Sequence, residues 1–187
     1  VKVEGDIFGN EKDSAVFMWS EPNAKLIVEG NITARDCQSA IEIYGLSGEM
    51  DSLREIPAIT VKTLNVESGN YFKALTHDEN GEEIESKSLA EAAAKATWYI
   101  VDISQPTNGE IEVDGISAKE GLLVAHEGDK LTVTGAPKKG YRLTGIDAGS
   151  KALVTENEDG TYTVTVERGG DVTISASFEA MPEMPLT

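Results

Sequence analysis

The sequence has very little of several residue types on which much protein chemistry depends. Its 187 residues include one cysteine and two histidines, which excludes an internal disulfide and leaves little material for a histidine-based metal site. Sixteen Lys and Arg face 33 Asp and Glu, for a net charge of −17. That shortage of positive charge argues against nucleic acid and anionic membranes as partners. No apolar run approaches the ~20 residues that span a bilayer.

What remains is sufficient for a folded protein. Hydrophobic residues make up 40% of the chain, too many for a disordered acidic tail. The length allows one or two domains. The sequence contains no phosphate-binding loop, dinucleotide fingerprint or nucleophile elbow, so nucleotide and serine-hydrolase chemistry are not indicated.

The first half repeats itself at an offset of 25 residues. Residues 3–7 match residues 28–32, and residues 14–19 match residues 39–44. Within each copy, apolar and polar residues alternate, which predicts short strands with one buried face. A weaker third copy at 64–67 matches 26–29 at an offset of 38. We attribute the additional 13 residues to an insertion around 46–58.

A short repeat of short strands is typical of one coil in a right-handed parallel β-helix, where equivalent residues of successive coils stack. A duplicated hairpin in a β-sandwich is the alternative. Residues 88–97 predict the one helix, with a capping box formed by Ser88 and Glu91. This helix would either cap the stack or separate two domains, and residues 98–101 predict a strand after it.

From residue 103 onwards, frequent turns predict a small antiparallel β module. Alternating runs at 110–113, 130–134, 141–146, 161–166 and 172–178 are its expected strands. The expected core residues are Tyr141, Leu143, Tyr162, Val164, Val166 and Phe178.

Several segments of this half resemble a known repeat family. A Pro-Lys-Lys-Gly-Tyr segment at 137–141 leads into one strand, the Gly-Asp-Lys-Leu-Thr-Val-Thr segment at 128–134 forms another, and a Thr- and Ser-containing strand ends at Phe178. In this order they resemble the divergent internalin B-type B-repeat over residues 103–179. Ile146 stands where the family usually has tryptophan, which keeps the position apolar. The resemblance implies an extracellular spacer or adhesive module of bacterial surface proteins and supplies no catalytic residues.

The last eight residues contain two prolines and predict an extended linker. Residues 184–187, Met-Pro-Leu-Thr, resemble the Leu-Pro-x-Thr part of a sortase sorting signal with Met in place of Leu. A chain boundary inside a linker is the alternative explanation. We therefore expect an extracellular, cell-surface location, with cell-wall anchoring in a Gram-positive bacterium as a further expectation.

Two groups of residues are candidate sites. The first is acidic: equivalent carboxylates on successive coils, with Glu67 as a third rung, could bind Ca²⁺, although a solvated acidic face is the favoured explanation. Its members are Glu4, Asp6, Glu29 and Asn31. The second group is aromatic, because Phe8, Phe17, Trp19 and Tyr44 could supply an exposed groove for a ligand. Trp19 and Tyr44 occupy equivalent positions in the repeat, which favours simple stacking of the two rings. We expect His77 and His126 to be surface or edge residues, and Cys37 to be a free, partly buried thiol.

The sequence thus predicts an all-β protein, with a short parallel β-helix-like solenoid, one short helix and a small antiparallel β module. The expected divisions are 1–85, 86–102, 103–179 and 180–187. We expect a non-catalytic, secreted, monomeric stalk or adhesion module without a cofactor, with a host or cell-wall glycan or protein as partner. The alternative is a carbohydrate-binding or polysaccharide-degrading β-helix, a lyase or hydrolase.

Overall fold

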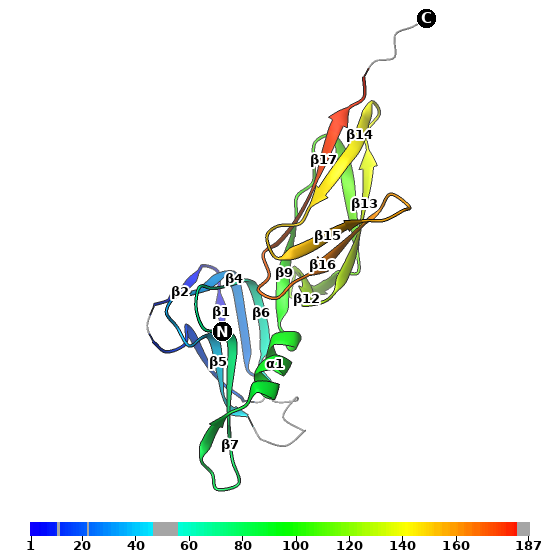
Figure 1. The fold of residues 1–187 in the computed structure, drawn as a ribbon. Coiled ribbons are helices and arrows are strands. Elements are labelled where there is room, and N and C mark those ends of the chain that lie inside the picture. The colour runs from blue at the N-terminus through cyan, green and yellow to red at the C-terminus, as the bar shows by residue number, and fades with distance from the viewer. Residues whose placement is uncertain (11, 22, 47–55, 183–187) are drawn as a thin grey trace, which may run out of the picture.

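A computed structural model describes residues 1–10, 12–21, 23–46 and 56–182, and it is almost entirely β (Figure 1). One helix, α1 (Lys87–Ala96), interrupts the strands of the described chain. The strands are β1 (Lys2–Val3), β2 (Ile7–Gly9), β3 (Val16–Trp19), β4 (Lys25–Ala34), β5 (Ser39–Leu46), β6 (Ala58–Val66), β7 (Asn70–His77), β8 (Glu83–Glu85), β9 (Trp98–Ile103), β10 (Gly109–Asp114), β11 (Ser117–Lys119), β12 (Leu122–His126), β13 (Lys130–Pro137), β14 (Tyr141–Asp147), β15 (Ala152–Glu156), β16 (Tyr162–Val166) and β17 (Val172–Ala180).

The described residues of 1–85, here called the N-terminal stack, form strands that alternate between two sheets. The first sheet contains β1, β2, β4 and β6, and the second contains β3, β5, β7 and β8. Val3 pairs in parallel with Val28 and Val16 with Ile41, which confirms the offset of 25 residues. Apolar side chains from both sheets form one buried core. The parallel pairing follows from the repeat, whereas the right-handed β-helix remains a prediction.

The predicted third copy of the repeat is misaligned. Leu64 pairs with Ile32, at an offset of 32, and Val61 pairs with Val28, at an offset of 33. The expected offset of 38 is therefore wrong. Residues 64–67 resemble residues 26–29 in sequence, but Leu64 pairs with Ile32, in a later part of β4. The interval between Val28 and its partner Val61 is thus eight residues longer than the 25 residues between Val3 and Val28. Most of the predicted insertion at 46–58 lies outside the described residues.

The N-cap of α1 lies two residues before the predicted one. Ser86 is the N-cap, and its hydroxyl accepts a hydrogen bond from the Leu89 backbone N–H at 3.4 Å. The hydroxyl of Ser88 instead lies 3.2 Å from that of Ser86, so the predicted cap at Ser88 is wrong. Ala93 and Ala94 are buried in the core cluster, on a helix that contacts β7.

Strand β9 belongs to both halves of the chain. It pairs in parallel with β6 through Trp98, antiparallel with β12 through Ile100, and in parallel with β17 through Val101. One nine-stranded sheet consequently continues from the N-terminal stack into the C-terminal part. The strand expected at 98–101 is therefore β9, which both parts of the chain share.

The C-terminal module, residues 103–182, contains every strand expected there, and also β11, β12 and β15, which the sequence did not indicate. Its four-stranded sheet has the order β10-β13-β16-β15, while β14 and β17 form an antiparallel pair extending towards the C-terminus (Figure 1). No helix of the described chain is long and apolar enough to span a membrane.

The predicted core of the module is correct only in part. Tyr162, Val164 and Val166 are buried between the sheets. Tyr141, Leu143 and Phe178 are only partly buried, since they lie on the outlying β14–β17 pair. The other fully or nearly buried apolar residues of the module include Ile111, Leu131, Val133, Val172 and Ile174.

Candidate functional site

Three aromatic side chains lie side by side on the second sheet of the N-terminal stack. Trp19 on β3 and Tyr44 on β5 pair in register, and their ring centroids are 5.4 Å apart. The ring of Phe17 lies 6.0 Å from that of Tyr44. We call these three side chains the aromatic row. The structure thus brings together three of the aromatic candidates, Phe17, Trp19 and Tyr44.

The aromatic row points away from the core. Val16 and Met18, which alternate with its members along β3, pack against the buried cluster. Successive side chains of a strand point to opposite faces, so Phe17 and Trp19 lie on the outer face of the sheet. Trp19 is 69% exposed. The indole lies beside Gly45, whose positive φ of 77° suits glycine.

A buried ion pair lies beside the row. Glu42 stands opposite Phe17 on β5 and is only 2% exposed. Its carboxylate accepts a hydrogen bond from Ser14 at 2.6 Å and another from the ammonium group of Lys73 at 3.0 Å. Burial alone raises the pKa of Glu42, but the hydrogen bonds from Ser14, Lys73 and Tyr44 outweigh it and lower that pKa. Glu42 is therefore held ionised and fully engaged.

The acidic candidates do not form the predicted ladder. Glu29 pairs with Lys2 at 2.8 Å. Asp6 accepts a hydrogen bond from the backbone N–H of Asn31 at 2.7 Å. Glu67 forms a bidentate pair with Arg35 instead of stacking on Glu29, because the true register differs from the predicted one.

Among the described residues, no group of three or more His, Cys, Asp and Glu side chains is placed to hold a metal ion. Glu4 and Glu29 occupy equivalent positions of the repeat, next to the pair Val3 and Val28. Two of the predicted Ca²⁺ ligands already have protein partners, since Glu29 pairs with Lys2 and Asp6 accepts from the Asn31 backbone. The carboxylates of this face therefore take part in a mixed-charge surface.

The remaining polar candidates are dispersed. Cys37 is buried, and its thiol donates to the carbonyl oxygen of Arg35 at 3.4 Å. His77 is exposed at the end of β7. His126 is the last residue of β12: its Nδ1 lies 2.9 Å from the Thr97 carbonyl oxygen, and its ring lies 3.5 Å from that of Trp98. It is half-buried where the two parts of the chain meet.

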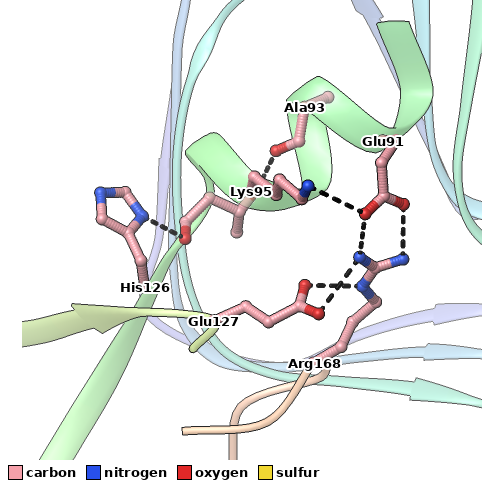
Figure 2. A network of polar contacts seen from close by, with 7 residues as sticks. Glu91, Ala93, Lys95, His126, Glu127 and Arg168 are labelled. Carbon is pink, nitrogen blue, oxygen red and sulfur yellow. Dashed lines mark hydrogen bonds and ion pairs between the residues drawn. The ribbon is translucent and has the colours of Figure 1, made fainter. Parts of the chain in front are cut away.

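Arg168 connects the helix with the C-terminal module (Figure 2). Its guanidinium donates to both carboxylate oxygens of Glu91 at 2.7 and 3.0 Å, and to those of Glu127 at 2.7 and 3.2 Å. These bonds raise the pKa of Arg168, and those to Glu91 lower the pKa of that carboxyl. Lys95 adds a longer contact to Glu91 at 3.9 Å. The two bidentate bonds fix the guanidinium in one orientation.

A second contact between the halves surrounds Trp98. Lys119, on β11, places its ammonium 4.5 Å from the Trp98 ring centroid, and the His126 ring lies against the same indole. Glu120, in the β11–β12 turn, forms an ion pair with Lys25 of the N-terminal stack. A groove of about 450 Å³ runs between these groups. Because Trp98 is already occupied by two side chains, this groove offers no free aromatic face.

The sequence did not identify Glu42, Lys73 or Arg168. Glu42 carried a usable signal, because a charged residue stands where the preceding repeat has Phe17. Arg168 carried none, since its partner Glu91 is 77 residues away.

The comparison with known families matches one part of the chain. Residues 99–182 match the family model described as the divergent InlB B-repeat domain. This interval begins within β9, the strand that both halves share. No significant match was found among curated proteins. The search of solved structures likewise returned no significant match.

Proposed function

We propose that this chain, whose residues 99–182 match the divergent InlB B-repeat domain, is a non-catalytic structural or adhesive segment of a bacterial surface protein. B-repeats of this kind are associated with bacterial surface proteins. The N-terminal stack would then be carried, at a defined angle, by the repeat module. The alternative function, a polysaccharide lyase or hydrolase, would require a free acid or base.

The shared strand β9 is the observation that carries this proposal. A spacer that presents a binding face must transmit orientation from one domain to the next, and a continuous sheet does this better than a linker. The two parts lie end to end, with the β14–β17 pair at the far end of the module (Figure 1). Arg168 adds a further link between the two parts through its ion pairs with Glu91 and Glu127.

The buried carboxylate of the N-terminal stack supports the non-catalytic part of the proposal. Glu42 is the one acidic side chain among the described residues that is fully buried. Ser14 and Lys73 both donate to it, so it has neither the raised pKa of a general acid nor a free oxygen directed at a substrate.

Labelling of intact cells tests the proposed location. Antibodies against the stack should bind intact cells of the bacterium that produces the protein, and external protease should release peptides of this chain. Antibodies against a cytoplasmic protein serve as the control for cell integrity. Detection of the chain only after lysis would contradict the proposal.

A further inference from the structure

The aromatic row has a position that additional strands cannot cover. Strands added at the free edge of β3 would lie in the plane of the second sheet, alongside the whole of β3. The outer face, which carries Phe17 and Trp19, would stay in water. Phe17 and Trp19 are 51% and 69% exposed, and the half-buried Tyr44 lies between them, so this face is a candidate binding surface.

The shape of the row suits sugar rings. Tyr44 lies between Phe17 and Trp19, with interplanar angles of 34° and 36° to them, so the three rings follow one another across two strands. Pyranose rings present C–H faces that stack on aromatic rings. Phe8, although 73% exposed, lies on β2 in the other sheet and has no ring contact with the row among the described residues.

The charge around the row selects among sugars. Burial first, and then the nearby carboxylates of Glu42, Glu83 and Asp13, raise the pKa of the Tyr44 hydroxyl. Lys73, the cation nearest in register, donates to both Glu42 and Gln38. Lys73 neutralises Glu42, so the acidity that a ligand would meet comes from Glu83, Asp13 and the net charge of −17, which attracts cations at long range. Aromatic faces also attract ammonium groups directly.

We propose that the aromatic row binds a cationic glycan, a polysaccharide whose amino sugars carry free ammonium groups. Stacking of pyranose faces on Trp19, Tyr44 and Phe17 would supply contact area, and the acidic surroundings would supply selectivity. The proposal rests on the adhesive part of the proposed function and names its ligand class. An anionic glycan would be repelled, and an apolar protein surface would gain nothing from the carboxylates.

Calorimetric titration with three oligosaccharides of equal length tests the ligand class. The probes are oligomers of glucosamine, of N-acetylglucosamine and of galacturonic acid. The glucosamine oligomer should bind at least about tenfold more tightly than its acetylated form, because only the former has ammonium groups for the rings and carboxylates. Added salt should weaken its binding. Equal affinity for the acetylated oligomer, or no binding of the glucosamine oligomer, would overturn the proposal.

Trp19→Ala tests the site, with Phe8→Ala as the matched control on the other sheet. Both side chains are exposed, so both variants should keep the wild-type melting temperature. Trp19→Ala should lose at least about tenfold in affinity, whereas Phe8→Ala should bind like the wild type. Wild-type affinity in Trp19→Ala would show that binding is only long-range attraction between polymers and would overturn the site.

The same titrations separate this inference from the proposed function. Chromatography of the oligosaccharides after incubation would reveal cleavage, which would contradict the non-catalytic function and leave the binding site intact. Absence of binding would overturn the glycan site and leave the surface location, measured on intact cells, unaffected.

Discussion

At the residue scale, the N-terminal stack places one charge where its repeat has an aromatic residue. Glu42 occupies the position that Phe17 holds in the preceding coil, and its side chain is buried. A buried carboxylate is tolerated only when cations and hydrogen-bond donors surround it. Lys73 and Ser14 provide these, so the pair is important for the pairing of β5 with β7 and for the support of the aromatic row.

Removal of the cation should therefore be costly. Lys73→Met leaves the carboxylate of Glu42 buried and unpaired, and should lower the free energy of unfolding by about 3 kcal/mol at pH 7. Urea denaturation measures the change. Lys62→Met is the matched control, because Lys62 pairs with the exposed Asp102 and should cost less than about 1 kcal/mol. Equal costs in the two variants would contradict the importance of the buried pair.

The pH dependence has a definite sign at Glu42. Its folded pKa is lowered from 4.5, so the stability it contributes is present above that ordinary value and is lost as pH falls through the folded pKa. In Lys73→Met, protonation of Glu42 removes the unpaired charge. The difference between wild type and Lys73→Met should accordingly shrink when the urea titrations are repeated at acidic pH.

The acidic candidates lead to a further expectation for Ca²⁺. Glu29 and Asp6 are engaged by Lys2 and by the backbone of Asn31, and no metal-holding group occurs among the described residues. The melting temperature should therefore be the same, within measurement error, in excess Ca²⁺ and in excess chelator. A rise of several degrees in Ca²⁺ would show that the carboxylates bind the ion.

At the element scale, the start of α1 distinguishes the observed cap from the predicted one. Ser86→Ala removes the hydroxyl that accepts from the Leu89 N–H and should cost about 1 kcal/mol of stability. Ser88→Ala removes a hydroxyl within the exposed first turn and should cost less than about 0.5 kcal/mol. Thermal or urea unfolding of the two variants checks this order, which would reverse if Ser88 were the cap.

The loop before β17 makes a second prediction at this scale. Gly170 has a φ of 74°, and a methyl group there would come within 2.4 Å of the Lys62 carbonyl oxygen and 2.7 Å of the Tyr99 ring. Gly170→Ala should therefore separate the loop from β6 and cost more than about 2 kcal/mol. Gly160→Ala is the control, because its φ of 82° is similar but open space surrounds it. Its cost should be about 1 kcal/mol.

At the scale of the whole molecule, the two halves should unfold together. They share β9 and one sheet, and Arg168 links α1 with the module. Differential scanning calorimetry should show a single transition in which the calorimetric and van't Hoff enthalpies agree. Two resolved transitions in the wild type would mean that the halves are independent domains.

Arg168→Ala should weaken this coupling, because it leaves Glu91 and Glu127 without their shared cation. The loss should be about 2 kcal/mol at pH 7. The folded pKa of Glu91 is lowered, so the contribution of its pair is present above its ordinary value and disappears as pH falls through the folded pKa. The calorimetric difference between Arg168→Ala and the wild type should thus decrease in acid, and Lys151→Ala serves as a surface control.

The sequence predicted short-range features better than long-range ones. The 25-residue offset, the helix and five strands of the module follow from alternation and turns, and the structure confirms them. The third copy was misaligned because four similar residues, 64–67, cannot distinguish between two positions on the same coil. Strands β11, β12 and β15 were missed because short runs next to turns carry little periodicity.

The sequence by itself determined the all-β class, the parallel register of the first two coils and the pairing of Trp19 with Tyr44, because each depends on spacing along the chain. Only the tertiary structure decided that β9 is shared, that Arg168 reaches Glu91, and that Glu42 is buried with Lys73. These depend on contacts between residues far apart in sequence, where the partner is selected by the packing of complete sheets and leaves no local pattern.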